Sequence, residues 1–498
     1  MPFRHLCAAL IAAFALIATP ALAQEAETAP RDESTAPGGF RLGLLPADAT
    51  TQHVLKTASG EIRYTATAGT LDLVAPDGRI NAKIFYTSYV AEGADSRRPL
   101  TFAFNGGPGA ASAYLHLGLA GPRVLDFGPN ANDGTTPELG DNPDSWLAFT
   151  DLVFIDPVGT GWSRAADDST ARRYFGVNQD AEALAKAIAL YVQNNNRISS
   201  PKYLLGESYG GFRAGKVAAA LKDSQSILVS GIVMVSPMIE ANLIFGGSSH
   251  PVGAAVQLPS IVAAEIERRG SFSPEKVAEA EKFAMTDYLV ALAGPEPAGA
   301  AAERLYQKIA ELTGIPKDLV ARRRGFVGEI YEEAVAGKIV SVYDAAITAP
   351  DPFPETGRIG AEDPVLDGYT RAYGAAFASY ARNELNYPCG LTYMLLNTEV
   401  NRRWEWGEGG RYQAGASNEI RSLLASIPEF RLLIVHGYSD VITPFGASRY
   451  VIDHIPRALS EGRVELKLYR GGHMFYTEPA SRSEMSRDAA RFYRKDPA

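Results

Sequence analysis

The chain has 498 residues, of which 46% are hydrophobic and 21% are charged, as is ordinary for a globular protein. Its formal net charge of −9 argues against non-specific binding to nucleic acids, which requires a basic surface. The nearest basic run, 322–324, is better explained as a solvated helix end, so we expect no nucleic-acid partner.

The first 23 residues have the pattern of a secretory signal peptide. Arg4 precedes an apolar run over 6–17, and Ala21-Leu22-Ala23 forms a small-residue cleavage site. This apolar run is too short to span a bilayer, for which roughly 20 residues are needed, so we expect no stable membrane insertion. The sequence predicts a signal peptide over 1–23, a disordered leader over 24–39, and export to the periplasm or the medium.

The pattern of the rest of the chain predicts the strands of a β-sheet with helices between them. Alternating runs within 52–93 predict antiparallel edge strands. Continuous apolar runs then predict central strands of a parallel sheet that is buried on both faces: 101–104, 152–155, 202–205, 232–235, 432–435 and 464–469. A helix is predicted over 178–192, with Asn178 as its N-cap and Asp180 in its first turn.

Residues 246–385 break this pattern. They are rich in Ala, Glu, Lys and Arg with helical periodicity, as in 274–292 and 303–312, and they carry no strand signal of comparable strength. We interpret them as a helical cap inserted between two core segments, 40–245 and 386–498, and covering the active site. The alternative is a helical subdomain that does not contact substrate.

Export implies an oxidising compartment, yet only Cys389 would remain after removal of the signal peptide. An internal disulfide is then impossible, and Cys389 is interpreted as a packing residue. Because the sequence contains no CxxC, HExxH or paired-His spacing, we expect neither a metal nor a cofactor.

A nucleophile elbow is indicated by the motif Gly206-Glu207-Ser208-Tyr209-Gly210. An apolar strand precedes it and a small-residue helix follows, as a sharp strand–turn–helix junction requires. The flanking glycines avoid Cβ collisions in this turn, and Ser208 is lifted clear of the sheet. We therefore predict Ser208 to be a catalytic nucleophile.

An acid and a histidine should follow Ser208 after later strands. Asp440 comes just after strand 432–435, and His473 follows strand 464–469 across Arg470-Gly471-Gly472. His436 is interpreted as a histidine at the edge of the core. The order Ser208, Asp440, His473 is that of the α/β hydrolases, so we predict this fold, with a mixed, mostly parallel sheet and an inserted helical cap.

An oxyanion hole needs backbone N–H donors aimed at the developing charge. One donor normally belongs to the residue after the nucleophile, here Tyr209. A second is expected from the glycine-rich loop Asn105-Gly106-Gly107-Pro108-Gly109, which directly follows strand 101–104. The loop lacks the patterns of phosphate- and dinucleotide-binding loops.

These motifs together resemble the serine carboxypeptidases, the relatives of cathepsin A and of the yeast vacuolar carboxypeptidase. The resemblance covers roughly 85–245 and 385–498, and 437–445 with 471–476 look like the bacterial branch. It implies release of C-terminal residues from a peptide substrate through an acyl-enzyme on Ser208, with His473 as base and Asp440 as its orienting acid. It further implies oxyanion donors on Gly107 and Tyr209. Asn105 and Glu207 would help to hold the terminal carboxylate.

The chain departs from the family pattern at two positions. A second glutamate of the carboxylate site is replaced by Leu119, so we expect Glu207 to stay neutral through desolvation, and we consider Arg123 as a substitute donor. Tyr476 replaces a proline usual in eukaryotic members, and we expect it to affect pocket shape more than chemistry. Two alternatives therefore stay open: an esterase, amidase or acyltransferase with the same triad, and a binding protein on an inactive hydrolase fold.

Overall fold

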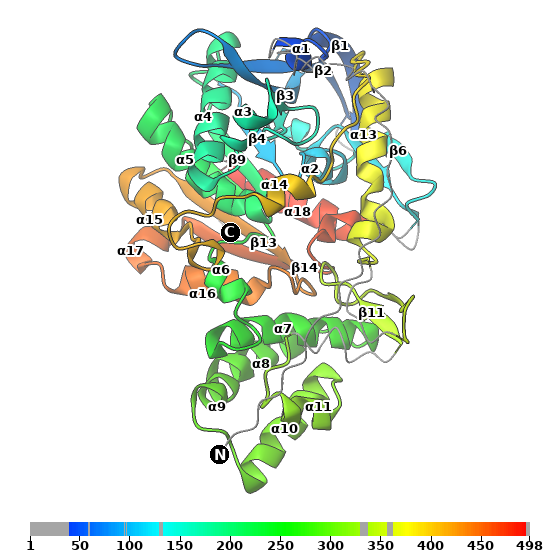
Figure 1. The fold of residues 1–498 in the computed structure, drawn as a ribbon, viewed down its shortest axis with the longest axis vertical. Coiled ribbons are helices and arrows are strands. Elements are labelled where there is room, and N and C mark those ends of the chain that lie inside the picture. The colour runs from blue at the N-terminus through cyan, green and yellow to red at the C-terminus, as the bar shows by residue number, and fades with distance from the viewer. Residues whose placement is uncertain are drawn as a thin grey trace, which may run out of the picture. The chain divides into compact units, whose positions relative to one another are not determined.

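A mixed β-sheet forms the centre of the protein (Figure 1). The computed structural model describes residues 39–494 except 58–59, 94, 96, 129–132, 329–336 and 356–361. The predicted signal peptide, and the predicted leader up to residue 38, lie outside the described residues. Among the described residues, no helix combines the length and the apolar character needed to cross a membrane.

The sheet confirms the predicted fold class. Its strand order is β1(Ala49–Thr57), β2(Gly60–Val74), β3(Ile80–Ala91), β7(Asp151–Ile155), β4(Leu100–Phe104), β9(Lys202–Glu207), β10(Gly231–Val235), β13(Arg431–Gly437) and β14(Val464–Tyr469), while β8(Arg164–Ala165) pairs with β3. The pairings from β1 to β7 are antiparallel, and those from β7 to β14 are parallel. Every predicted central strand is present, and the alternating runs form the antiparallel edge.

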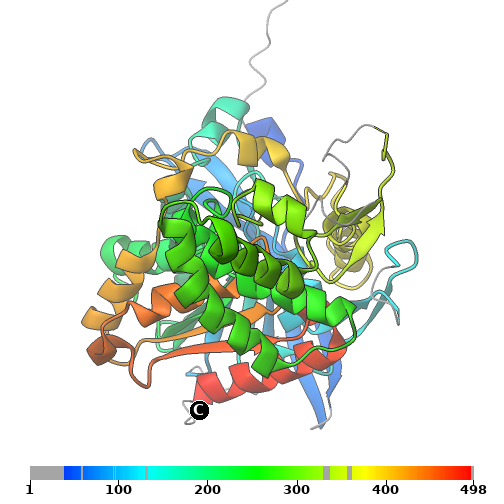
Figure 2. The same ribbon diagram turned by 90° about the horizontal axis from the view of Figure 1, so that it is seen from below.

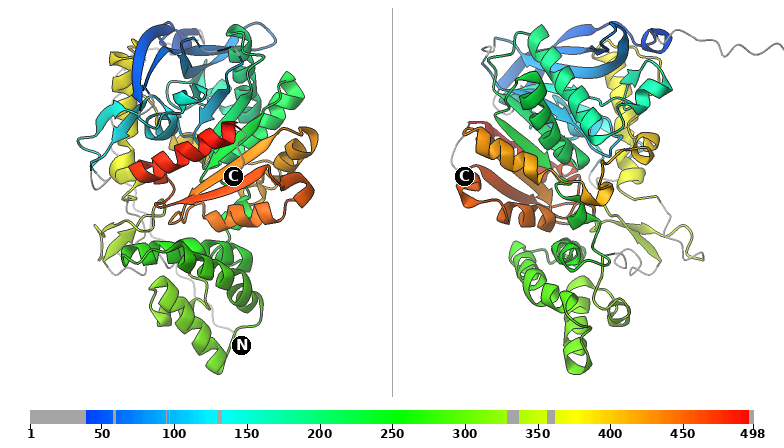
Figure 3. Two further views of the ribbon diagram at one scale, coloured as in Figure 1. Left: turned by 180° about the vertical axis from the view of Figure 1, so that it is seen from behind. Right: turned by 60° about the vertical axis from the view of Figure 1, so that its left-hand side comes forward.

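Successive side chains of the central strands point into two different apolar layers, as the two-residue period of a strand requires. Phe102 and Leu204 face the layer that contains α4(Val177–Asn194) and α5(Tyr209–Gln225). Ala103 and Leu205 face the layer of α13(Ala372–Asn383) and α18(Pro479–Arg494). Figure 3 shows α18 on the face of the sheet opposite α4 and α5. Burial of both faces explains why these strands are uninterrupted apolar runs.

Helix α4 begins earlier than predicted. Its N-cap is Gly176, so the assignment of Asn178 as N-cap is wrong. Asp180 lies in the first turn, as expected, but it is buried and forms an ion pair with Arg213 of α5 at 2.6 Å. This pair links the two helices that lie beneath the nucleophile elbow.

The inserted region contains α7(Pro251–Arg268), α8(Pro274–Phe283), the π-helix η3(Ala284–Tyr288), α9(Leu289–Ala293), α10(Gly299–Thr313) and α11(Lys317–Arg322). These helices, green in Figure 2, share an apolar cluster with Val441 and Phe445, and α7 packs on α16(Phe445–Asp453). Short strands β11(Lys338–Val340) and β12(Thr348–Pro350) follow, which the sequence did not indicate, and then the π-helix η4(Leu366–Thr370). The basic run 322–324 is an exposed helix end, as predicted.

The remaining elements are short connections around these layers: α1(Gly39–Leu42), α2(Ala113–Leu115), η1(His116–Ala120), β5(Arg123–Asp126), β6(Glu138–Asp141), η2(Trp146–Ala148), α3(Asp168–Arg172), α6(Ala241–Ile244), α14(Thr398–Arg402), η5(Arg411–Gln413), α15(Ser417–Ser426), α17(Arg457–Ser460) and η6(Phe475–Thr477). Cys389 is a buried free thiol in the layer of α13, which agrees with a packing role.

Candidate active site

Ser208 occupies a strained turn between β9 and α5. Its backbone has φ 62° and ψ −126°, a conformation that non-glycine residues rarely adopt. A Cβ atom on Gly206 would come within 2.0 Å of the Gly210 carbonyl oxygen, so this turn requires a glycine there. The Ser208 N–H donates to the Val235 carbonyl at 2.9 Å, which ties the elbow to β10. A strained strand–turn–helix junction is thus present where the nucleophile elbow was predicted.

The glycine-rich loop after β4 packs directly on this elbow. A Cβ atom on Gly106 would lie 2.6 Å from the Tyr209 backbone nitrogen, and Gly107 has φ +99°. Tyr209 is the first residue of α5, where backbone N–H groups lack partners within the helix and the helix dipole is positive. Gly107 and Tyr209 line the same cavity as Ser208. The loop and the helix therefore bring two candidate N–H donors close to Ser208.

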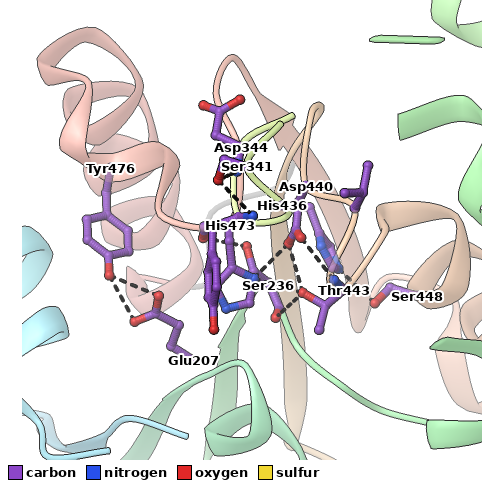
Figure 4. A network of polar contacts seen from close by, with 12 residues as sticks. Glu207, Ser236, Ser341, Asp344, His436, Asp440, Thr443, Ser448, His473 and Tyr476 are labelled. Atoms are coloured by element: carbon purple, nitrogen blue, oxygen red, sulfur yellow. Dashed lines mark hydrogen bonds and ion pairs between the residues drawn. The ribbon is translucent and has the colours of Figure 1, made fainter. Parts of the chain in front are cut away.

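His473 and Asp440 form a buried pair beside this cavity (Figure 4). The carboxylate can only accept, so His473 Nδ1 donates to Asp440 Oδ2 at 2.9 Å. This leaves Nε2 as the nitrogen available to a proton donor in the cavity. Burial alone would lower the pKa of His473, but the charge and hydrogen bond of Asp440 outweigh it, and the pKa is raised.

Two hydroxyl side chains fix the pair in place. Thr443 donates to Asp440 from its backbone N–H at 2.9 Å, and its Oγ1 lies 2.8 Å from Asp440 Oδ2 and 2.9 Å from His473 Nδ1. Ser236 Oγ donates to the His473 carbonyl at 2.8 Å. His436, by contrast, is buried on β13 with Nε2 2.8 Å from Ser448 Oγ, as expected for a core-edge histidine.

The inserted region reaches the His473 loop through its main chain. The His473 N–H donates to the Tyr343 carbonyl at 2.5 Å, and the Ala345 N–H donates to the Ser439 carbonyl at 3.0 Å. Ser439 Oγ in turn donates to Asp344 at 2.7 Å. A Cβ atom on Gly472 would lie 2.1 Å from the Tyr343 carbonyl oxygen, so only glycine fits this contact. Residues 343–345 thus hold the loops that carry Asp440 and His473 in place through hydrogen bonds.

One cavity brings together most of the predicted site residues. Its lining includes Asn105, Gly107, Glu207, Ser208, Tyr209 and His473, while Asp440 lies behind His473. From the inserted region, Tyr343 and Leu366 line the cavity, and among the described residues α7 to α11 contribute nothing to its lining. The part of the chain that the structure describes holds no group of three or more His, Cys, Asp or Glu placed to bind a metal ion.

Glu207 is a buried acid on the cavity wall. The hydroxyl of Tyr476 lies 2.9 Å from each of its carboxyl oxygens (Figure 4). The Asn105 amide donates to Oε2. Burial raises the pKa of Glu207 to about 7, although the charge of His473 and these two hydrogen bonds act in the other direction. The carboxyl group therefore changes protonation state near neutral pH. This agrees with the expectation that desolvation keeps Glu207 protonated above its ordinary pKa.

The two departures from the family pattern turn out to be adjacent. Leu119 is fully buried in η1 and does not line the cavity. Its neighbour Gly118 makes room for the Tyr476 ring, because a Cβ atom there would lie 2.6 Å from Tyr476 Cε2. We expected Tyr476 to affect pocket shape more than chemistry, and the structure adds a chemical contact, because the Tyr476 hydroxyl lies 2.9 Å from both carboxyl oxygens of Glu207. Arg123 pairs with Asp141 at 2.6 Å and Glu384 at 3.1 Å, away from the cavity lining, so it is not a substitute donor.

Sequence reasoning missed two further residues of the site. Arg213 is buried and donates to the Asn105 carbonyl and to Asp180, and so fixes the start of the glycine-rich loop. Its position three residues after the elbow glycine Gly210 is the only sequence signal for this role. Arg411 lines the cavity from η5 and lies far from every motif, so no local pattern identifies it.

Part of the chain is similar in sequence to known proteins. Residues 64–244 match the family model described as serine carboxypeptidase. This segment is serine carboxypeptidase-like. Serine carboxypeptidase-like 44 of Arabidopsis thaliana is 29% identical over 160 residues, which cover 32% of this chain and 31% of that relative. A carboxypeptidase Y homolog of Arthroderma benhamiae is 29% identical over 166 residues, again 32% of this chain and 31% of the relative. The matched part thus spans about a third of these relatives.

The serine carboxypeptidase-like segment contains the glycine-rich loop, β9 and the elbow, whereas Asp440 and His473 lie outside it. A solved structure of Kex1(delta)p, a prohormone-processing carboxypeptidase from Saccharomyces cerevisiae, aligns with 87% of this chain and 92% of its own. The TM-score is 0.56 at 14% sequence identity. This likeness extends over both core segments and shows that they form an α/β-hydrolase fold.

Proposed function

We propose that the protein is a serine carboxypeptidase that releases C-terminal residues from peptides. The observation that carries this proposal is one cavity that contains a serine in a strained elbow, a buried Asp–His pair and a buried acid with a pKa near neutrality. The first two features suit nucleophilic acyl transfer. The third suits recognition of a carboxylate. The match of residues 64–244 to the serine carboxypeptidases supports the same conclusion.

The proposed reaction begins when Ser208 Oγ attacks the carbonyl of the last peptide bond. His473 Nε2 takes the hydroxyl proton, while Asp440 holds the ring in the required tautomer and stabilises its charge. The N–H groups of Gly107 and Tyr209 stabilise the oxyanion. His473 then passes the proton to the leaving amine, and the C-terminal amino acid departs. Water, deprotonated by the same imidazole, attacks the acyl-enzyme and releases Ser208.

Glu207 and Asn105 would hold the terminal carboxylate of the substrate. An ionised Glu207 repels a carboxylate, whereas the neutral acid donates a hydrogen bond to it. In this chain Tyr476 supplies the neighbour that a second acid supplies elsewhere in the family. Because a phenol carries no charge here, Glu207 keeps its proton mainly through burial, with a smaller contribution from the charge of Asp440, and recognition is proposed to depend on pH near 7.

The inserted region 246–385 is proposed to act as a cap, because its residues Tyr343 and Leu366 line the cavity. The core segments 40–245 and 386–498 supply the catalytic residues. Export through a signal peptide over 1–23, and membership of the bacterial branch, complete the proposal. They are supported by the N-terminal sequence pattern and by the motifs over 437–445 and 471–476.

The test compares an N-blocked dipeptide with its C-terminal amide at pH 5 and pH 7.5, using the wild type and Ser208→Ala. A serine carboxypeptidase should prefer the free acid, and the serine variant should lose activity by several orders of magnitude. Equal or better cleavage of the amide, still dependent on Ser208, would identify an esterase, amidase or acyltransferase. That second function is favoured by one observation, the absence of an acid at Leu119. No reaction of Ser208 with a fluorophosphonate in folded protein would indicate an inactive hydrolase fold.

A further inference from the structure

Arg411 places a guanidinium group at the wall of the cavity that contains Ser208. It belongs to the short helix η5 and lies between two aromatic rings. Its guanidinium carbon is 3.8 Å from the centroid of the Phe245 ring and 5.5 Å from that of Trp406. Both rings also line the cavity. Cation–π contacts of this kind orient a guanidinium without neutralising its charge.

This charge has no acidic partner in the described part of the chain. Burial against the rings lowers the pKa of Arg411, and no carboxylate opposes the shift. The group stays protonated at physiological pH because arginine titrates far above it. Arg213, by comparison, is buried against a carboxylate, that of Asp180. Arg411 is exposed, and an unpaired guanidinium that two rings orient at the wall of a cavity is available to bind an anion supplied by a ligand.

Arg411 and Glu207 both line the cavity but contact different residues, and we call the lining around each of them its wall. Glu207 contacts Asn105 and Tyr476. Arg411 contacts Trp406, whose ring packs 5.5 Å from that of Tyr209, the residue on the other side of the nucleophile. If Glu207 holds the terminal carboxylate of the leaving residue, the Arg411 wall receives the residue that is acylated onto Ser208. The side chain of that residue is then the group nearest to the guanidinium.

We propose that Arg411 is a specificity-determining residue that selects substrates with a carboxylate side chain, Asp or Glu, immediately before the scissile bond. The proposal rests on the proposed function for its assignment of the two walls. A planar guanidinium binds a carboxylate through two parallel hydrogen bonds, which an amide of the same shape cannot reproduce. Discrimination between Glu and Gln at that position therefore measures the charge rather than the size of the side chain.

The test uses two N-blocked dipeptides that differ only in Glu or Gln before the same neutral C-terminal residue. The wild type should prefer the Glu substrate on the order of tenfold to a hundredfold in kcat/KM, the range expected for hydrogen bonds between charged groups. Arg411→Gln should remove this preference by slowing the Glu substrate alone, and Arg411→Lys should keep part of it. Arg403→Gln, which alters an exposed arginine paired with Glu399, is the matched control and should change neither rate.

Two results would overturn the proposal. One is equal cleavage of the two substrates by the wild type. The other is an equal loss on both substrates in Arg411→Gln, which would mean that the side chain only supports the aromatic wall. A loss that depends instead on the free C-terminal carboxylate, measured against the amides, would assign Arg411 to the leaving residue and would also contradict the proposal.

The corresponding p-nitrophenyl esters of N-blocked Glu and Gln separate this inference from the proposed function, because they carry no C-terminal carboxylate. A Glu preference on the esters that Arg411→Gln removes, together with no release of C-terminal residues, would uphold Arg411 and reject the carboxypeptidase. Release of C-terminal residues with no Glu preference on either substrate type would do the reverse.

Discussion

The protonation of Glu207 should decide how strongly the enzyme prefers a free C-terminal acid over the corresponding amide. The pKa of Glu207 is raised from 4.5 to about 7, and burial is the main cause. With a pKa of about 7, the protonated fraction falls from about 0.9 at pH 6 to about 0.1 at pH 8. Because only the protonated form accommodates the substrate carboxylate, the acid-to-amide ratio of kcat/KM should fall about tenfold over this interval.

The ratio is the appropriate quantity because the protonation of His473, the proposed general base, affects the rates with both substrates. Since the pKa of His473 is raised above its ordinary value, the rates with both substrates should increase as pH rises and the imidazole loses its proton. This effect cancels when the two rates are divided. The assay is therefore kcat/KM for an N-blocked dipeptide and its amide from pH 5 to pH 8.5, in the wild type and in two variants.

Glu207→Gln should make the ratio independent of pH, because an amide side chain donates at every pH. Tyr476→Phe should move the midpoint to higher pH, because the Tyr476 hydroxyl stabilises the ionised carboxylate. A ratio that rises with pH, or one that falls equally in the wild type and Glu207→Gln, would refute the reasoning. A midpoint shifted to lower pH in Tyr476→Phe would refute the assigned role of the hydroxyl.

Three further predictions concern the architecture of the site. Gly106→Ala should lower kcat by about 10²–10³-fold, because its Cβ would lie 2.6 Å from the Tyr209 nitrogen and displace an oxyanion donor, whereas Gly140→Ala, with no atom within 4 Å, should have no effect. Steady-state kinetics on both variants check this prediction. Equal kcat values for Gly106→Ala and the wild type would contradict it. Arg213→Ala should destabilise the fold by about 3–5 kcal/mol in urea unfolding, because it leaves the buried Asp180 without its partner. Lys216→Ala, which breaks the more exposed pair with Glu419, should cost no more than about 1 kcal/mol, and similar midpoints for the two variants would contradict the assignment. Glu207 binds its proton more tightly in the folded protein than in the unfolded chain, so its contribution to stability is complete below pH 4.5 and is lost as pH rises through about 7. Glu207→Gln should remove that loss in the free energy of unfolding, which amounts to at most about 3 kcal/mol. If the free energies of unfolding of the two proteins instead ran parallel between pH 4.5 and 8, Glu207 would not be desolvated.

The sheet could be predicted because its physical requirements are local. A strand buried on both faces must be apolar throughout, and each predicted central run, such as 202–205, is a strand in the structure. The elbow could be predicted for the same reason, since a turn with Ser208 at φ 62° needs small neighbours on each side. Strand order then placed Asp440 and His473 after successive parallel strands, where their side chains meet.

The surroundings of Glu207 could not be predicted in this way. Tyr476 is 269 positions away from Glu207, and the contact exists because Gly118 leaves space for an aromatic ring. Neither residue is informative without the packing of η1 against η6. The N-cap of α4 was misplaced because Gly176 caps without a side chain, while Asn178, a favourable capping residue, lies inside the helix. Strands β11 and β12 have three residues each, too few for a periodic pattern.

The hydrogen bonds between residues 343–345 and the His473 loop limit which parts of this protein can be exchanged with those of another hydrolase. Caps of hydrolases are attractive modules for exchange, because they sit between two strands of an otherwise constant core. Here the main-chain carbonyl of Tyr343 accepts a hydrogen bond from the backbone N–H of His473, and only glycine at Gly472 leaves room for that carbonyl. A chimera that imports another insertion must therefore retain 343–345 with the host core, or import the His473 loop along with the donor's own segment.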